Sequence, residues 1–367
     1  MYWGTYDTGK PRNRIIQRGL RDNNVQVTEC HANVWAGVED KSQIKHLHLQ
    51  IWFFVRWLAC YPRLVVRFLR APRPEVIIVG YLGHLDILVL WPLAKLKRVP
   101  VVWDAFLSLH DTVVYDRALI HKYNPLALLL YLWEWLACRA ADYVILDTRA
   151  HADFFVERFK LNPAKVGAVY VGAEPEVFQK ILKSAKTAEV SLLFYGQFIP
   201  LHGIENIIEA SQLVAAESTR WLVIGTGQEA KKIERLLKDG PYKNLHWLDW
   251  VAYEDLPTYI GAADICLGIF GTSDKAARVI PNKVFQIIMA GKPLITRDSP
   301  AIRELLGAPG LPVKLIAPGS AEALARAVRQ LIEELPELRE NPYQDIVAKI
   351  SPQAVGRQLL KQLETIV

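Results

Sequence analysis

Residues 192–207 read LLFYGQFIPLHGIENI, and this stretch decides the fold. Its apolar start predicts a buried strand that ends at Gly196, and Gly203 precedes a segment whose apolar residues recur with helical spacing. A strand that runs through a glycine loop into a helix points backbone N–H groups and the positive helix end at an anion. The same residues also fit an ordinary strand-to-helix turn, so both interpretations stay open on this segment alone.

A second glycine loop follows in residues 223–230, VIGTGQEA. Gly225 and Gly227 stand between a predicted strand and a predicted helix, in the GxGxxA spacing of dinucleotide sites, and Asp249 follows Gly227 by 22 residues. A nucleotide-dependent oxidoreductase is therefore an alternative. The motif lies in the second strand–helix unit of its domain, not the first, which weighs against that alternative.

The third segment is basic. Residues 268–296 read GIFGTSDKAARVIPNKVFQIIMAGKPLIT, a strand followed by a loop with Lys275, Arg278 and Lys283, and then a helix preceded by Pro281. Three cations around one helix start favour a phosphate site over a solvated surface loop.

Working outward, the whole chain alternates short apolar runs with helical segments. Expected strands cover residues 25–30, 75–79, 99–102, 143–146, 168–170, 192–195, 221–224, 245–248, 265–268, 293–296 and 313–316. Expected helices cover residues 12–23, 126–140, 149–159, 203–214, 230–238, 284–289 and 321–335. This order predicts an α/β protein with two doubly wound, parallel-sheet domains, joined by a linker at residues 176–189 and separated by a cleft.

Polar residues follow the predicted strands of the first half. Gly9 and Lys10 form a turn into a helix, His84 follows one strand, and Asp104 and His110 follow the next. Each residue alone fits an ordinary loop position. As a set at adjacent strand ends, they predict one side of the cleft.

Positive charge is concentrated in the first half. The chain has a net charge of +6, but residues 1–187 hold 25 Lys and Arg against 17 Asp and Glu. Residues 41–74 contain no acidic residue, seven basic ones and six aromatic ones. On one continuous helix, Lys45, Arg56, Arg63, Arg67 and Arg70 would share a 60° arc at about 100° per residue.

This basic block has three interpretations. A basic stripe beside aromatic residues such as Trp52 and Trp57 is typical of a helix on an anionic membrane surface. A core helix with a solvated basic edge fits equally well, and Pro62 weakens both by interrupting the helix. Nucleic acid is disfavoured as a partner because no nucleic-acid motif accompanies the patch.

Composition narrows the class of protein. The chain has 367 residues, of which 51% are apolar and 22% charged, so it is globular and long enough for two domains. Mean hydropathy is +0.11, yet no run reaches the roughly 18 apolar residues of a membrane span, and no secretion signal is expected at the start. The four cysteines form no CxxC pair, which argues against zinc and disulfides. No DxD triplet occurs, so a metal–diphosphate site of that kind has no candidate. No metal or other cofactor is expected, and a nucleotide sugar would be a co-substrate.

The second half resembles the family 4 (group 1) glycosyltransferases of the GT-B fold. GQFIPLHG stands for their G-R-x-x-P-x-K-G element, GTG for GxG, VAYEDLPTYIGAAD for the following strand–helix element, and PNKVFQIIMAGKPLI for P-s-K-x-x-E-x-x-a-x-G-k-P. A last helix, SPQAVGRQLLKQLETI, resembles the one that crosses back to the N-terminal domain. The first half resembles the family more loosely, through the Gly9 turn and VGAEPEVF.

The chain departs from this family at four positions. Gln197 and His202 stand where the family has the Arg and Lys that bind the donor diphosphate. Arg278 and Gln286 stand where it has two glutamates, one for the donor sugar and one for the ribose. Gln286 can still bond a ribose hydroxyl, whereas Arg278 can only act on phosphate, together with Lys283. Either the donor is held by a rearranged set of charges or the chain has lost activity.

The resemblance implies a GT-B protein with an acceptor-binding domain at residues 1–180, on which helix 351–367 packs, and a nucleotide-sugar-binding domain at residues 188–350. It implies a retaining, metal-independent glycosyltransferase that acts on a lipid-linked or membrane-proximal acceptor, peripherally on the cytoplasmic face of the plasma membrane. A non-catalytic GT-B partner protein is a further alternative. The expected catalytic residues are Asp104, His110, His202 and Arg278, and the expected acceptor residues are Gly9, Lys10 and His84. The expected donor residues are Gly196, Gln197, Gly203, Gly225, Gly227, Val251, Ile280, Pro281, Asn282, Lys283 and Gln286. The expected membrane residues are Trp52, Arg56, Trp57, Arg63, Arg67 and Arg70.

Overall fold

The computed structural model describes residues 1–35, 47–178, 189–238, 240, 242–337 and 342–366. The chain forms two compact units. The first comprises residues 1–114, 120–171 and 352–367, and the second comprises residues 115–119 and 172–351. Most of the predicted linker, and Lys41 and Lys45 of the basic block, lie outside the described residues.

The first unit is built on a six-stranded, all-parallel sheet in the order β2-β1-β3-β4-β5-β6. Its strands are β1 (Tyr2–Gly4), β2 (Glu29–His31), β3 (Ile77–Val79), β4 (Val101–Phe106), β5 (Tyr143–Leu146) and β6 (Val166–Ala168). Its helices are α1 (Pro11–Asp22), α2 (Leu47–Ala59), α3 (Tyr61–Arg70), α4 (His84–Lys97), α5 (Pro125–Ala140), α6 (Arg149–Phe159) and α15 (Pro352–Leu363). A π-helical turn, η2, covers Asp111–Asp116, and a 3-10 turn, η3, covers Pro163–Lys165.

Apolar residues on both faces of these strands explain the helix layers. Val79 and Trp103 belong to the cluster that α3, α4, α5 and α6 cover, whereas Ile78 and Val102 face α1 and α15. Strand β1 was missed because three residues are too few to show a period. Of the strand predicted at residues 25–30, only the end belongs to β2.

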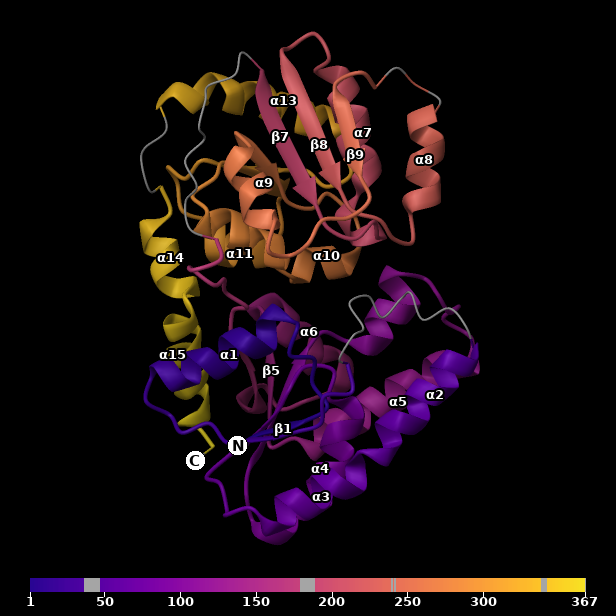
Figure 1. The fold of residues 1–367 in the computed structure, drawn as a ribbon, viewed down its shortest axis with the longest axis vertical. Coiled ribbons are helices and arrows are strands. Elements are labelled where there is room, and N and C mark those ends of the chain that lie inside the picture. Colours follow the sequence, from indigo (N-terminus) through magenta and orange to yellow (C-terminus); the bar gives the residue numbers. More distant parts are fainter. Residues whose placement is uncertain (36–46, 179–188, 239, 241, 338–341, 367) are drawn as a thin grey trace. The chain divides into compact units, whose positions relative to one another are not determined.

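The second unit repeats the plan with a parallel sheet in the order β12-β11-β10-β7-β8-β9 (Figure 1). Its strands are β7 (Val190–Tyr195), β8 (Thr219–Ile224), β9 (Leu245–Leu248), β10 (Ile265–Leu267), β11 (Leu294–Arg297) and β12 (Val313–Ile316). Its helices are α7 (Ile204–Leu213), α8 (Ala230–Lys238), α9 (Leu256–Ala262), α10 (Asp274–Arg278), α11 (Asn282–Met289), α12 (Pro300–Leu306), α13 (Ala321–Glu334) and α14 (Gln344–Ile350). The 3-10 turns are η4 (Pro200–His202) and η5 (Leu335–Glu337). Leu192 and Phe194 of β7 pack against α7 and α13 in its main core.

The basic block does not form one continuous helix, as the position of Pro62 suggested. The chain turns at Cys60 between α2 and α3, with Pro62 in the first turn of α3. Proline has no N–H and its ring clashes with the preceding turn, so it starts a helix readily and continues one poorly. Arg63, Arg67 and Arg70 still share the exposed side of α3, but Arg56 belongs to another helix.

Helices α1 and α15 cross with their backbones in contact in the first unit (Figure 1). A β-carbon at Gly19 would overlap the Pro352 carbonyl oxygen, and one at Gly356 would overlap the Gly19 carbonyl oxygen. Only glycine at both positions allows this close approach.

We therefore expect Gly19→Ala or Gly356→Ala to lower the free energy of unfolding by about 1–3 kcal/mol, the usual effect of overpacking a close contact. The control is Lys361→Ala on the exposed side of α15, which should stay within about 0.5 kcal/mol of the wild type. Urea denaturation followed by circular dichroism measures all three variants. Wild-type stability in both glycine variants would contradict the backbone contact.

Candidate anion-binding site

The loops that follow β7 and β8 pack against each other in the second unit. The Gly196 N–H donates to the Ile224 carbonyl (2.9 Å), and the Phe198 N–H donates to the Thr226 carbonyl (2.9 Å). A β-carbon at Gly225 would overlap the Gly196 carbonyl oxygen. Gly196, Gly225 and Gly227 have φ values of 142°, 145° and 156°, which side-chain-bearing residues rarely adopt. The GTG motif is thus required for loop packing, a purpose independent of any dinucleotide.

Lys283 is the most unusual group beside these loops. Its side chain is buried, and among the described residues its ammonium has no hydrogen-bond partner. The ammonium lies 3.7 Å from the centre of the Phe194 ring, and a β-carbon on Gly196 would lie 2.9 Å from it. Burial lowers the pKa of the Lys283 ammonium well below its ordinary value. A buried cation without an acceptor is costly, and a bound anion would remove that cost.

His202 stands where the family has a lysine, but its surroundings differ from those of a cation that binds phosphate. Its ring is buried, and Nδ1 makes a short hydrogen bond with the Gln197 carbonyl. Burial, followed by the charge of nearby Lys283, lowers the pKa of His202 well below its ordinary value. The imidazole is therefore neutral, and Nδ1 must be the protonated nitrogen because it faces a carbonyl oxygen. His202 therefore does not replace the charge of the lysine that the family has at this position, and its burial beside another cation was invisible in the sequence.

The predicted basic loop divides between α10 and α11. Lys275 is buried and its ammonium lies 3.3 Å from a carboxylate oxygen of Asp116, so its charge is largely compensated. Arg278 ends α10 and is half-buried. Pro281 caps α11 through its backbone alone, which leaves the first N–H groups of the helix without a side-chain cap. Asn282, another expected donor residue, begins α11. Ile280, also an expected donor residue, is buried just before Pro281.

The remaining expected donor residues, which are Gln286, Gln197, Gly203 and Val251, differ in exposure and in hydrogen bonding. The Tyr195 hydroxyl donates to the side-chain oxygen of Gln286 (2.9 Å), so one end of this amide is already bonded. The side-chain oxygen of Gln197, which is exposed, accepts from Arg117 Nη2 at 3.4 Å. Gly203, with a φ of 62°, ends η4 and starts α7, and Val251 lies half-buried after β9.

In the first unit, a buried carboxylate joins two of the predicted residues. Glu134 of α5 lies 3.2 Å from Nε2 of His84, and it accepts from the Ser108 hydroxyl (2.6 Å) and the His110 N–H (3.2 Å). The structure thus brings His84 and His110 together at the carboxyl ends of β3 and β4. Burial lowers the pKa of His110. The role of Glu134 was missed because it stands alone in the apolar helix.

Asp104 has a structural role in place of the predicted catalytic one. Its side chain is fully buried, and both carboxylate oxygens accept from the equally buried Arg12, at 2.8–3.1 Å. Arg12 Nη2 also approaches the Leu146 carbonyl (3.4 Å) and so ties α1 to the ends of β4 and β5. Breaking such a buried pair costs about 3–5 kcal/mol. Gly9 donates its N–H to Asp7 (2.8 Å), and Lys10 caps α1 through its backbone.

In the second unit, Lys283, the Gly196 loop and the start of α11 thus form a candidate anion site. A cation and the positive end of a helix are complementary to phosphate oxygens. Within the ranges that the structure describes, no group of three or more His, Cys, Asp or Glu side chains could hold a metal ion.

Comparison with known proteins shows which proteins the chain is similar to. Residues 189–334 match the family model described as "Glycosyl transferases group 1". The chain is 26% identical over 144 residues to the putative colanic acid biosynthesis glycosyl transferase WcaI of Escherichia coli K12, covering 38% of this chain and 35% of the relative. It is 27% identical over 214 residues to the chitobiosyldiphosphodolichol beta-mannosyltransferase of Eremothecium gossypii, covering 50% and 45%. The chain thus spans less than half the length of the curated relatives it matches.

Similarity to solved structures extends over the full chain. The structure of Anabaena HepE in complex with UDP superimposes with a TM-score of 0.68 at 14% identity, covering 100% of this chain and 99% of the other. The fold and the family model agree with the expectation from the sequence. The chain has the GT-B fold, and its second half carries the domain of the group 1 glycosyltransferases.

Proposed function

We propose that this protein is a retaining, metal-independent glycosyltransferase that moves a sugar from a nucleotide-diphosphate sugar to a lipid-linked or membrane-proximal acceptor. Such a reaction belongs to glycolipid or cell-surface polysaccharide synthesis. The observation that carries the proposal is the buried Lys283 ammonium, which has no hydrogen-bond partner in the described residues and lies beside Gly196.

The reaction makes one strong electrostatic demand. When the bond between the sugar and the diphosphate breaks, the leaving nucleotide diphosphate gains negative charge, which must be stabilised in the transition state. Lys283 and the N–H groups at the start of α11 supply positive charge without a metal ion, and Arg278 adds to it. Neutral His202 orients the Gln197 carbonyl and the loop around it. Its proposed role is therefore positioning.

Two comparisons support the substrate classes. HepE was solved with UDP, a nucleotide diphosphate of the kind that Lys283 would bind. The name of the Eremothecium gossypii relative specifies a dolichol-linked acceptor, and that of WcaI specifies synthesis of colanic acid. We assign the acceptor to the first unit, where Glu134 holds His84 and the His110 backbone at the strand ends.

Retention of configuration follows from the family resemblance, whereas the name of the Eremothecium gossypii relative specifies a β-mannosyl product. Proton NMR of the donor and the product reads both anomeric configurations from their coupling constants. Matching configurations support retention, and opposite ones contradict it. Activity that is lost in EDTA and restored by Mg²⁺ contradicts metal independence.

An oxidoreductase and a non-catalytic partner protein would each give a different experimental result. The glycines that suggested an oxidoreductase serve the packing of the β7 and β8 loops, and oxidation of a reduced nicotinamide cofactor by the protein would revive that function. A non-catalytic partner protein would bind nucleotide and turn over no sugar donor.

The first test of the donor site is Lys283→Met, which keeps the length of the side chain and removes its charge. We expect nucleoside diphosphate binding to weaken by about 1.5–3 kcal/mol, roughly 10- to 150-fold, and nucleoside binding to change little. Isothermal titration with UDP, GDP and ADP, each beside its nucleoside, measures the difference. The control is Lys238→Met at the exposed end of α8. Equal weakening for nucleoside and diphosphate would contradict the assignment.

The pH dependence of diphosphate binding shows whether Lys283 or His202 supplies the positive charge. Because the pKa of Lys283 is lowered, the ammonium of the free protein loses its proton below the ordinary lysine range, and diphosphate binding then requires proton uptake. Affinity for a nucleotide sugar, whose diphosphate does not titrate near neutrality, should fall with rising pH already below the ordinary lysine range, by up to about tenfold per pH unit. Lys283→Arg should flatten this profile, since arginine stays charged. His202→Gln should leave its shape unchanged, because the pKa of His202 is depressed and the ring is neutral throughout. A profile that follows His202 would contradict this account.

The proposed membrane surface lies on the first unit. Trp52 of α2 is exposed, with the Arg56 guanidinium over its ring, and Arg63 and Arg70 are exposed on α3. Trp57 instead donates its indole N–H to the Thr5 hydroxyl (2.8 Å), and Arg67 donates to the His31 carbonyl (3.0 Å), so both anchor helices to the sheet. α5 adds exposed apolar side chains: Leu126, Leu128, Leu129, Leu132 and Leu136. No described helix is long and apolar enough to cross a membrane.

We expect the triple change of Arg56, Arg63 and Arg70 to Gln to weaken binding to anionic vesicles by about 3 kcal/mol, or roughly 100-fold, at about 1 kcal/mol per cation. Added salt should release the wild type, because exposed charges are screened beyond about 8 Å at physiological ionic strength. Co-sedimentation with vesicles of increasing phosphatidylserine content measures both effects. The matched control changes Lys231, Arg235 and Lys238 of α8, all exposed, to Gln. A wild type that stays in the supernatant at every lipid composition would contradict membrane docking.

A further inference from the structure

A short segment from the first half of the sequence belongs to the second unit. Residues 115–119 pack there, although the residues on either side of them belong to the first unit. Asp116 fixes the segment: its carboxylate accepts from the Ser273 hydroxyl (3.1 Å) and lies 3.3 Å from the Lys275 ammonium. The Asp116 side chain is fully buried in this contact.

Arg117 follows directly and reaches the β7 loop. Its backbone carbonyl accepts from the Gln228 side chain (3.0 Å) in the loop after β8, and Nη2 approaches the Gln197 side-chain oxygen (3.4 Å). Its Nε atom is buried and has no hydrogen-bond acceptor among the described residues. The next residue, Ala118, has a φ of 48°, a conformation that non-glycine residues seldom adopt and that tertiary contacts must hold.

The contacts of the Arg117 guanidinium fit a ligand-binding residue better than a structural one. A guanidinium in a purely structural position usually pairs with a carboxylate, yet the neighbouring carboxylate, Asp116, is taken by Lys275. Arg117 instead makes a long hydrogen bond to the neutral side-chain amide of Gln197. The charge of Arg117 also contributes to the low pKa of His202, so the guanidinium acts on the same loop as Lys283.

We propose that Arg117 binds the diphosphate of the donor and supplies the second cation that Gln197 and His202 do not provide. This inference rests on the proposed function. Gln197 is the position at which the group 1 enzymes that the sequence resembles carry an arginine, and Arg117 brings a guanidinium to that residue from a segment 80 positions earlier in the chain. A guanidinium can donate two parallel hydrogen bonds to phosphate oxygens, whereas Lys283 acts as a point charge. The altered loop is thus a rearranged site and not a lost one.

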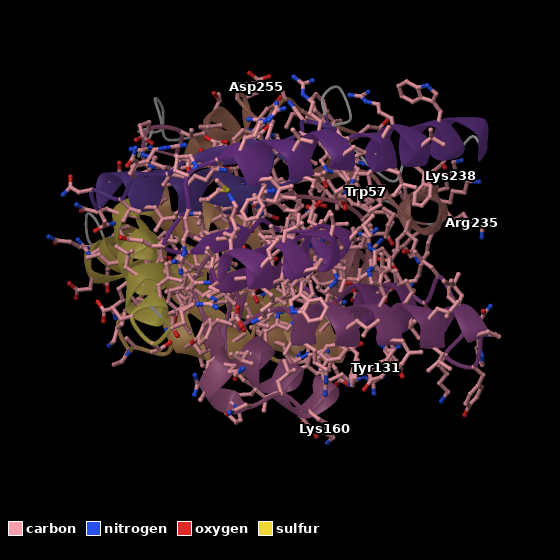
Figure 2. The ribbon with its side chains drawn as sticks, turned by 90° about the horizontal axis from the view of Figure 1, so that it is seen from below. Trp57, Tyr131, Lys160, Arg235, Lys238 and Asp255 are labelled. Carbon is pink, nitrogen blue, oxygen red and sulfur yellow. The ribbon has the colours of Figure 1, made fainter. Side chains whose placement is uncertain are left out.

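The experiment measures dissociation constants of UDP, GDP and ADP, their nucleosides, and inorganic pyrophosphate in EDTA. Arg117→Gln should weaken binding of the preferred diphosphate at least tenfold and leave its nucleoside within twofold. Arg117→Lys should have an intermediate effect. The double variant Arg117→Gln with Gln197→Arg returns a guanidinium to the loop and should bring the constant to within threefold of the wild type. Arg235→Gln, an exposed arginine on α8 labelled in Figure 2, is the matched control and should bind as the wild type does.

Diphosphate binding by Arg117→Gln within twofold of the wild type overturns the inference while leaving the proposed function intact. Equal weakening for nucleoside and diphosphate, or failure of Gln197→Arg to restore binding, also overturns it, because either result means that the change disturbs the segment as a whole. A wild type that binds pyrophosphate through Arg117 but none of the nucleoside diphosphates supports the inference and contradicts the proposed function. A wild type that binds none of these ligands overturns both.

Discussion

The burial of one ammonium group constrains the second unit more than any other feature. Lys283 lies against the Phe194 ring with no hydrogen-bond acceptor in the described part of the chain. Removing an ion from water costs several kcal/mol in real proteins, and a cation–π contact returns only about 2 kcal/mol. Burial accordingly lowers the pKa of this group. Because burying this charge costs more than the aromatic contact returns, the site favours an anionic ligand.

The surrounding backbone exists in a form that only glycine permits. Gly196 and Gly225 bring two loops into contact at positive φ values, and Gly196, which has no side chain, leaves room for the Lys283 ammonium. The buried pair of Asp116 and Lys275 holds residues 115–119 at the same place, which brings Arg117 to Gln197. In the proposed site, other segments therefore provide the charge that the loop sequence lacks.

Much of the fold could be predicted from local pattern. The strand Tyr143–Leu146 and the helix Arg149–Phe159 have the predicted bounds, because buried parallel strands are continuously apolar and Thr148 caps the helix that follows. The glycine loops and the basic helix start were also found, since both are short-range signals. Helix α3 shows the limit: Pro62 indicated an interruption of the basic block, but not that a separate helix would begin at Tyr61.

The charges of the site could not be predicted in the same way. His202 is neutral because it is buried beside Lys283. In the first unit, the Asp104 carboxylate is paired with Arg12. Arg117 contacts Gln197, which lies 80 positions later in the chain. Each outcome depends on which side chains meet in space, and no spacing in the sequence encodes it. The family resemblance pointed to the loop but not to the charged groups that lie beside it.

The most direct test is an experimental structure of the protein with the nucleoside diphosphate that it binds. The account predicts phosphate oxygens within hydrogen-bond distance, about 2.7–3.2 Å, of Lys283 Nζ, beside Gly196. Phosphates bound elsewhere, with Lys283 still lacking an anionic partner, would contradict it.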